Sequence, residues 1–133
     1  MSRVLVDTSA LLALLVPSVA AHTRAKRAFS RLRTREAVLL ITSYALLETY
    51  SLIERRLGLD AVRAFRERFV PLLEVIWVDA SLHEAGLDLM LQRERPRLSL
   101  TDAVTILVGR DAKVDELFAF DRHLEAAGLP TAR

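Results

Sequence analysis

The sequence predicts an α/β protein in which helices cover both faces of a parallel β-sheet. Short apolar runs alternate along the chain with longer segments of helical periodicity. Strands that are separated by helices need crossover connections, and such connections place the strands parallel in one sheet. No internal repeat, low-complexity tract or glycine-rich linker interrupts the 133 residues, of which only four are glycine. We therefore expect a single domain over residues 1–133.

The individual elements are predicted from apolar periodicity and from residues that begin or end helices. Strands are expected at 3–6, 38–41, 75–78 and 117–120. Helices are expected at about 8–16, 19–35, 43–57, 60–73, 81–94 and 101–111, with a short last helix that ends near 128. Pro17, Gly58 and Pro96 are helix stops, and Asp60 is a candidate cap. In such a fold, ligands bind beyond the carboxyl ends of the strands.

Composition narrows the class of protein. Cysteine is absent, which excludes disulfides, thiol catalysis and cysteine metal sites and fits a cytoplasmic protein. The apolar start of the chain imitates a secretory signal, but Asp7, Thr8 and Ser9 divide it. The apolar piece that remains, residues 10–16, is far shorter than the roughly 20 residues that span a bilayer. We expect a protein that is soluble, is not exported and makes no membrane contact.

Aspartates follow three of the predicted strands. Asp7 comes directly after "RVLV", Asp79 after "VIWV" and Asp121 after "LFAF". An aspartate between a strand and a helix is also an ordinary N-cap. Their position alone therefore does not indicate function, although it is where this architecture places ligands.

Two further carboxylates lie in apolar helical surroundings. Glu48 is four residues from both Tyr44 and Leu52, so it shares their helical stripe. Because an unpaired buried carboxylate is costly, Glu48 should face a cleft, an arginine or a cation. Asp102 follows Ser99 in a variant of the capping box, with Thr101 as the alternative cap. Each residue alone has a structural explanation: an ion pair for Glu48 and a helix start for Asp102.

Four segments in this order resemble the PIN-domain ribonuclease family, and most of all its VapC-type toxins: VLVDTSALLALL, SYALLETYSLI, RLSLTDAVTILVG and LFAFDRHL. The likeness covers essentially the whole chain. It implies a PIN-like three-layer α/β/α sandwich whose central parallel sheet has four or five strands in the order 3-2-1-4-5. It also implies a catalytic acidic metal site formed by Asp7, Glu48, Asp102 and Asp121, bordered by the supporting polar residues Thr8, Ser9 and Thr101. Asp79 would follow the far edge strand and is left out of the site.

The chain departs from the family pattern in two places. Family members usually carry Thr or Ser two residues before the last aspartate, where this chain has Ala119. A hydroxyl that would support Asp121 is therefore missing. The C-terminal "GLPTAR" has no clear apolar run for the family's last strand, so we expect that strand to be vestigial.

The acidic set predicts the kind of metal and of chemistry. Clustered carboxylates repel one another unless a cation joins them. Oxygen ligands without cysteine or clustered histidine select Mg²⁺, with Mn²⁺ as a substitute, over Zn²⁺. His22, His83 and His123 lie outside the acidic motifs and are interpreted as surface or structural residues. The resemblance implies endonucleolytic hydrolysis of RNA that leaves a 5′-phosphate and a 3′-hydroxyl.

Basic residues are almost all arginine, because only Lys26 and Lys113 of the 19 are lysines. Arginine forms bidentate contacts to phosphate and carboxylate, although a GC-rich or heat-adapted genome gives the same bias. Solvated helix surface is the plainer interpretation for most of them. Two groups are candidate contacts to RNA or a protein partner: Arg24, Arg27 and Arg31 on one helix face, and Arg93, Arg95 and Arg97 before Asp102. For the first group we favour a partner, because its helix is distant in sequence from every proposed ligand except Asp7.

We therefore expect a Mg²⁺-dependent endoribonuclease that is the toxin of a toxin–antitoxin pair. The resemblance implies a small antitoxin as partner and a homodimer. The alternative is a catalytically silent PIN-fold module that binds RNA or protein, which Ala119 favours and the four filled acidic positions oppose. Phosphate-transfer proteins fit poorly: position 9 is Ser where a haloacid-dehalogenase-like phosphatase needs Asp, and Lys113 precedes the strand that it would follow in a receiver.

Overall fold

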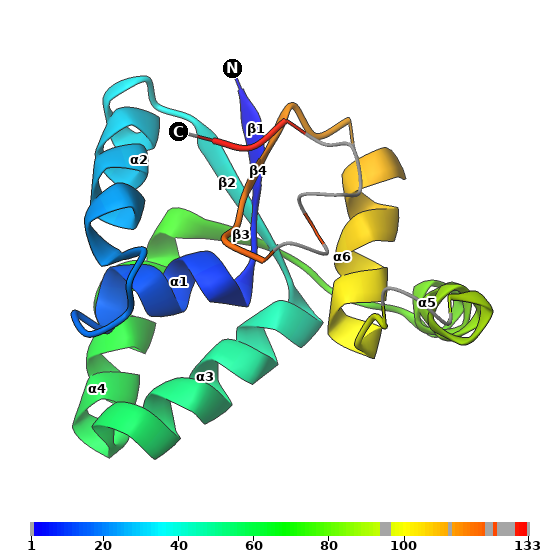
Figure 1. Cartoon of the computed structure of the whole chain (residues 1–133), viewed down its shortest axis with the longest axis horizontal. Helices are drawn as coiled ribbons and strands as arrows, with labels where there is room; N and C mark the ends of the chain where they lie inside the picture. Colours follow the sequence, from blue (N-terminus) through cyan, green and yellow to red (C-terminus); the bar gives the residue numbers. More distant parts are fainter. Residues whose placement is uncertain (1, 94–96, 112, 122–123, 125–129, 133) are drawn as a thin grey trace.

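Strands and helices alternate along the chain in the computed structural model, which describes residues 2–93, 97–111, 113–121, 124 and 130–132 (Figure 1). The elements are β1 (Arg3–Val6), α1 (Thr8–Leu15), α2 (His22–Thr34), β2 (Val38–Thr42), α3 (Ser43–Leu57), α4 (Leu59–Ala64), the π-helical turn η1 (Phe65–Phe69), the 3₁₀ turn η2 (Val70–Leu72), β3 (Leu73–Ile76), α5 (Ala80–Gln92), α6 (Leu100–Asp111) and β4 (Glu116–Phe118). The α/β class predicted from the sequence is confirmed.

The four described strands form one parallel sheet in the order β3-β2-β1-β4. This confirms the predicted order of the first four strands. The predicted fifth strand is, within the described residues, a single bridge between Leu117 and Thr131. The Leu117 amide donates to the Pro130 carbonyl over 2.7 Å, and the Ala132 amide donates to the Leu117 carbonyl over 2.8 Å. The expected vestigial strand is thus a short segment held against β4.

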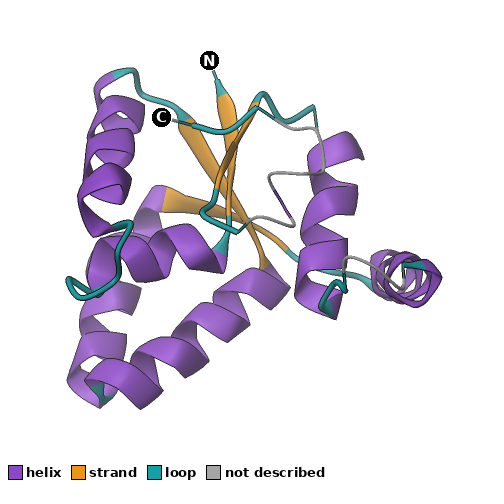
Figure 2. Ribbon diagram, viewed as in Figure 1, coloured by secondary structure: helices purple, strands orange, loops and turns teal. Residues whose placement is uncertain are grey.

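The sheet separates two apolar cores, and successive side chains of a strand alternate between them. Val4, Val6 and Ile41 pack on one side with α1, α2 and α3. Leu5 and Leu40 pack on the other side with α6. The helices stand on either side of the strands in Figure 2, which gives the predicted three-layer sandwich.

Close packing of α5 on α6 fixes the position of α6. A Cβ atom added at Gly86 of α5 would lie 2.6 Å from Cγ2 of Val104 on α6. Real side-chain carbons do not approach so closely, so the absence of a side chain at Gly86 is what permits this separation. The position of α6 matters because this helix carries Asp102.

The structure corrects the predicted bounds in the middle of the chain. The helix predicted at 60–73 is α-helical only to Ala64 and is capped by Gly58, at φ +89°, and not by Asp60. Beyond it the chain winds as η1 and η2, where Phe65 and Phe69 stack with ring centroids 5.5 Å apart. The third strand accordingly spans Leu73–Ile76 and not 75–78, because it pairs with β2 in that register.

Smaller shifts occur at both ends of the chain. Helix α2 begins at His22 and not at 19, and β4 ends at Phe118 and not at 120. The short helix expected before residue 128 lies outside the described residues. Among the described helices, none combines the length and apolarity needed to cross a membrane.

Candidate metal site and its surroundings

Helices α1, α3 and α6 begin at the carboxyl edge of the sheet, and the N-terminal parts of these helices bring acidic residues there (Figure 1). Asp7 directly follows β1 and is the N-cap of α1. Helix α3 begins directly after β2, so Glu48 lies on its second turn. The Ser99 hydroxyl accepts from the Asp102 amide over 3.0 Å, and this bond holds Asp102 in the first turn of α6. Of the two candidate caps, Ser99 is therefore the one used.

Asp7 is a buried carboxylate at this edge, with 3% of its surface exposed. Its Oδ2 accepts hydrogen bonds from the amide of Ser9 over 3.0 Å and from the hydroxyl of Ser9 over 2.7 Å. Burial raises the pKa of Asp7 from 3.8 to about 6; the bonds from Ser9 oppose this rise, and the charges of Asp102 and Asp121 add to it. At neutral pH Asp7 is ionised at a considerable energetic cost.

Glu48 lines an open groove of about 510 Å³ on the same side of the molecule, together with Tyr44, Leu47, Ser51, Ser99 and Thr101. Although its side chain is exposed, the groove walls withdraw it partly from water. This burial raises the pKa of Glu48 above its ordinary value, Asp102 and Asp121 raise it further, and a hydrogen bond with Thr101 opposes the rise. Glu48 thus faces a cleft, one of the three surroundings that its sequence pattern predicts.

Asp102 and Asp121 both raise the pKa of Asp7 and of Glu48, so the four predicted carboxylates share one electrostatic site. Their oxygen donors suit a hard divalent cation, which would relieve the mutual repulsion. Within the described ranges, however, no three acidic or histidine side chains stand close enough to enclose an ion as they are placed.

The predicted supporting residues differ in what they contact. The Ser9 hydroxyl bonds Asp7 and also accepts from the Phe120 amide over 2.9 Å. Thr101 contacts Glu48. Thr8 is buried, and its hydroxyl donates to the Ala45 carbonyl over 3.0 Å, which joins α1 to α3.

Asp79 and two of the three histidines, for which the sequence predicts structural or surface positions, make structural contacts in the described part of the chain. Asp79 caps α5 by accepting from the Leu82 amide over 2.8 Å, and it follows the far edge strand β3. His22 is hydrogen bonded to the Ala13 carbonyl, and His83 to the Tyr44 hydroxyl, at 2.7 and 2.6 Å. His123 lies outside the described residues.

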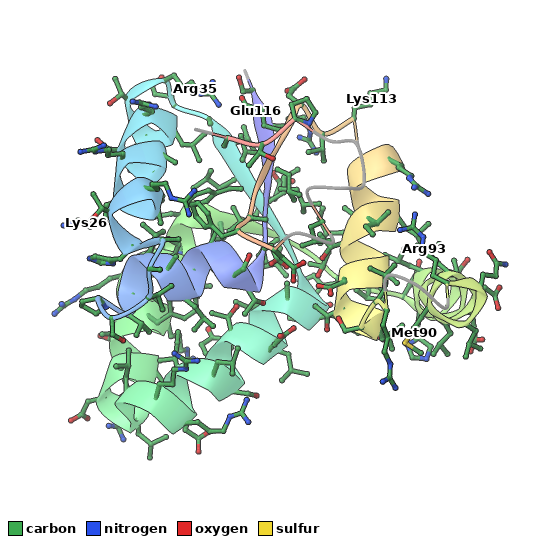
Figure 3. All side chains as sticks on the ribbon, in the orientation of Figure 1. Lys26, Arg35, Met90, Arg93, Lys113 and Glu116 are labelled. Carbon is green, nitrogen blue, oxygen red and sulfur yellow. The ribbon has the colours of Figure 1, made fainter. Side chains whose placement is uncertain are left out.

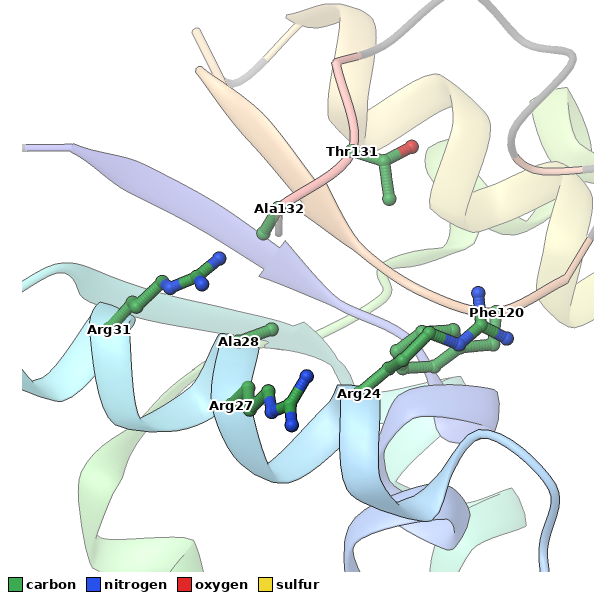
Figure 4. Close-up of a pocket in the computed structure, with 7 residues that line it drawn as sticks. All are labelled: Arg24, Arg27, Ala28, Arg31, Phe120, Thr131 and Ala132. Atoms are coloured by element: carbon green, nitrogen blue, oxygen red, sulfur yellow. The ribbon is translucent and has the colours of Figure 1, made fainter.

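The two predicted groups of arginines lie in different parts of the structure. Arg24, Arg27 and Arg31 line a groove of about 530 Å³ between α2 and the C-terminal segment (Figure 4). Arg93 lies beside α5, on the other side of the sheet from Lys26 of α2 (Figure 3). Arg97 is exposed, and Arg95 lies outside the described residues. Neither Arg93 nor Arg97 is among the described residues that line the two grooves.

Sequence reasoning missed two residues of these grooves. Phe120 lines the arginine groove, and Tyr44 lines the groove beside Glu48. The signal for Phe120 was its place between a strand and Asp121. The signal for Tyr44 was its position four residues before Glu48, on the same stripe of α3.

The sequence pattern that defines the PIN domain matches residues 4–129. The chain belongs to the PIN-domain family. The 23S rRNA-specific endonuclease VapC20 of Mycobacterium tuberculosis, in strains CDC 1551 / Oshkosh and H37Rv, is 30% identical over 131 residues, which cover 98% of each protein. The predicted resemblance to VapC-type toxins is confirmed.

Solved structures of similar fold agree with this assignment. The crystal structure of VapC20, described as a toxin that cleaves the sarcin–ricin loop, superposes with a TM-score of 0.84 over 98% of both chains. A protein from Pyrobaculum aerophilum, 28% identical, gives a TM-score of 0.61 over 95% of this chain and 86% of its own. FitAcB from Neisseria gonorrhoeae, 13% identical, gives a TM-score of 0.69 over 98% of this chain and 96% of its own. This is a likeness of fold alone.

Proposed function

We propose that this PIN domain is a metal-dependent endoribonuclease. The observation that carries the proposal is the shared electrostatic site, in which Asp102 and Asp121 raise the pKa of both Asp7 and Glu48. A group of carboxylates that destabilise one another at one edge of a sheet is what a divalent-cation site requires. The endonuclease activity of VapC20, a relative over 98% of the chain, supports the same conclusion.

Asp7, Glu48, Asp102 and Asp121 would hold Mg²⁺, or Mn²⁺ in its place. When bound, the ion supplies activation of water and stabilisation of charge on the phosphate. Ser9 keeps the buried carboxylate of Asp7 oriented through its two hydrogen bonds. Thr101 holds Glu48 at the groove, and Ser99 sets the first turn of α6. The products are an RNA fragment with a 3′-hydroxyl and one with a 5′-phosphate.

The direct test is cleavage of an RNA oligonucleotide that contains a single-stranded loop, with and without Mg²⁺. We expect cleavage only with the ion, loss of cleavage on chelation, and product ends that a phosphatase and a ligase identify. The matched control is the Asp7→Asn protein purified in parallel, which reveals any contaminating nuclease. Robust cleavage in excess EDTA by the wild-type protein would refute the proposed mechanism.

The biological role that we propose is that of a toxin restrained by a small antitoxin, in a cytoplasmic homodimer. The likeness to VapC20 supports this role. Trp77 and Leu91 are 76% and 73% exposed and offer apolar surface to protein partners. Induced expression should stop growth, and a small protein encoded beside this gene should restore it. Growth that continues under expression of active enzyme would remove the toxin role while leaving the nuclease.

A catalytically silent PIN module is the second candidate. It is favoured by the finding that, in the described residues, no three carboxylates already surround a common point. Ala119 supports it less than the sequence suggests, because Ala119 is fully buried in the apolar core and the Ser9 hydroxyl bonds the neighbouring Phe120 amide. Calorimetric titration with Mg²⁺ separates the two candidates: the nuclease binds the ion, and the silent module gives no heat.

A further inference from the structure

A groove between α2 and the C-terminal segment has a basic wall and an aromatic end. Arg24, Arg27 and Arg31 project from α2 toward it, and Phe120 and Thr131 lie opposite them (Figure 4). The three arginines are all exposed. The opposite wall is fixed, because residues 130–132 are hydrogen bonded to Leu117 of β4. The groove is therefore a formed feature of the fold.

The positive charge of this wall is not compensated inside the described part of the chain. Arg35 pairs with Glu116, and Arg63 pairs with Asp60. No carboxylate of the described residues forms such a pair with Arg24, Arg27 or Arg31. Three guanidinium groups that form no ion pair with a described carboxylate lie along one groove, and such a group of charges attracts a polyanion.

The length of this wall fits several phosphates of one strand. Arg24 and Arg31 are seven residues apart on α2, which corresponds to roughly 10 Å at 1.5 Å per residue. A helical nucleic-acid strand carries about three charges over that length. Arginine binds such phosphates through paired N–H donors.

The aromatic end distinguishes this groove from a plain basic surface. The guanidinium carbon of Arg24 lies 5.3 Å from the centroid of the Phe120 ring. Phe120 packs edge-to-face on Phe118, and its amide bonds the Ser9 hydroxyl, so the ring is held in place. Nucleobases stack on such aromatic rings and on guanidinium planes. The acidic side chains of a polypeptide would pair with the arginines but would not stack on the ring.

The groove also leads to the candidate metal site. Phe120 is followed directly by Asp121, whose charge acts on Asp7 and Glu48. Sequence distance suggested that α2 is remote from these carboxylates. The fold instead places Arg24 over the residue next to Asp121.

We propose that this groove binds the RNA strand beside the cleaved bond, with Arg24, Arg27 and Arg31 on successive phosphates and Phe120 stacking a base. The proposal rests on the ribonuclease function and adds to it the path of the substrate. It differs from the expectation, based on the sequence, that these three arginines contact a protein partner. An acidic partner remains the competing outcome of the test.

Binding is measured by fluorescence anisotropy with a labelled single-stranded RNA oligonucleotide in EDTA, so that no step depends on cleavage. The test protein carries Arg24→Ala, Arg27→Ala and Arg31→Ala. The charge-matched control carries Arg33→Ala, Arg66→Ala and Arg68→Ala, which are exposed arginines outside the groove. Melting curves verify folding, and poly-glutamate serves as the acidic polypeptide probe.

We expect the groove variant to lower RNA affinity at low salt and to reduce the slope of log K against log salt by about 2, since each lost contact to a single strand removes about 0.7. The control variant should change the RNA affinity and the salt slope far less. Phe120→Leu should weaken binding by about fivefold to a hundredfold, the range found when one stacked base is lost. Its salt slope should stay that of the wild type.

The proposal is overturned if the groove variant and the control have equal RNA affinities and slopes. It is also overturned if the groove variant loses poly-glutamate binding while RNA binding is unchanged, which would assign the groove to an acidic protein. RNA that binds in the groove but is never cut with Mg²⁺ would defeat the proposed function and leave the groove standing. If the groove variant cuts RNA normally, with unchanged KM, the groove is not part of the substrate path and the proposed ribonuclease function still stands.

Discussion

The hydroxyl of Ser9 donates a hydrogen bond to Oδ2 of Asp7 over 2.7 Å. The same hydroxyl oxygen accepts from the amide of Phe120 over 2.9 Å. Ser9 therefore joins the end of β1 to the segment after β4 that leads to Asp121. One side chain thus relates two of the proposed metal ligands, although they stand at opposite ends of the sequence.

Replacing Ser9 by Ala should reduce RNA cleavage and the affinity for Mg²⁺ by roughly tenfold to a hundredfold, as is usual when a group that orients a metal ligand is lost. Stability should fall by roughly 2–4 kcal/mol, because the change removes a hydrogen bond to an ionised carboxylate and an ordinary bond to the Phe120 amide. Mg²⁺ titration of the cleavage rate measures the first effect, and urea denaturation measures the second. Ser9→Thr retains the hydroxyl and should recover much of the activity. An Ala variant with wild-type Mg²⁺ dependence would contradict the orienting role.

Asp7→Asn should abolish cleavage and raise the stability of the metal-free protein at neutral pH. The pKa of Asp7 is about 6 in the folded protein against 3.8 unfolded, so between these values the folded state binds more protons. Stability of the wild-type protein should therefore fall as pH rises from 4 to above 6. The full difference is about 3 kcal/mol at 1.36 kcal/mol per pKa unit.

Urea denaturation in EDTA at pH 4.5, 6 and 8 checks this dependence. The Asn variant keeps an oxygen that accepts the Ser9 bonds but has no proton to exchange, so its stability should vary less with pH. Asp60→Asn, which alters an exposed aspartate paired with Arg63, is the matched control and should follow the wild type. Parallel pH profiles for the wild type and Asp7→Asn would refute this account of Asp7.

Mg²⁺ should oppose the pH dependence of stability that the metal-free protein shows. The ion binds ionised carboxylates, so protons compete with it below the pKa of Asp7. We expect about 10 mM Mg²⁺ to raise the melting temperature more at pH 8 than at pH 5, because stabilisation by a bound ligand grows with the logarithm of its affinity. The rise should be absent in Asp7→Asn. An equal rise at both pH values would indicate binding away from this site.

The strand positions were largely predictable from local rules, whereas the grouping of the four acidic residues into one candidate site came from the family resemblance. Apolar runs between helical segments marked the sheet, and Asp7 and Asp121 followed strands that end at the same edge. Glu48 stood out because its carboxylate lies between Tyr44 and Leu52 on a helical stripe that is otherwise apolar. Family resemblance supplied the strand order, which the structure confirms for the first four strands.

The remaining features depend on contacts between distant segments, which a single sequence does not encode locally. Arg24 meets Phe120 only because α2 and the end of β4 lie on the same side of the sheet. The early start of β3 follows from its register on β2 and from the turns η1 and η2, which interrupt a continuous helical pattern. The buried position of Thr8 likewise follows from a bond to α3.

Trp77 should report on the proposed homodimer. It is the single tryptophan of the chain, it is 76% exposed, and it follows the edge strand β3. An outer strand flanked by exposed apolar side chains favours association. If this side forms the dimer, tryptophan emission should move to shorter wavelength as protein concentration rises through the dissociation constant measured by ultracentrifugation. A dimer with unchanged emission would place the interface elsewhere.

Gly86→Ala should destabilise the protein even though alanine normally favours a helix. The new Cβ would lie 2.6 Å from Cγ2 of Val104 and 3.3 Å from Cδ1 of Leu100, and such overpacking costs about 1–3 kcal/mol. Val104→Ala removes the clashing methyl group but opens a cavity of its own. The double variant should therefore be more stable than the sum of the two single effects predicts, by about 1 kcal/mol or more.

Cleavage should fall in Gly86→Ala beyond the loss of folded protein, because α6 carries Asp102, and should partly return in the double variant. Additive free energies of unfolding would show that α5 and α6 separate freely and that Gly86 does not set the position of α6.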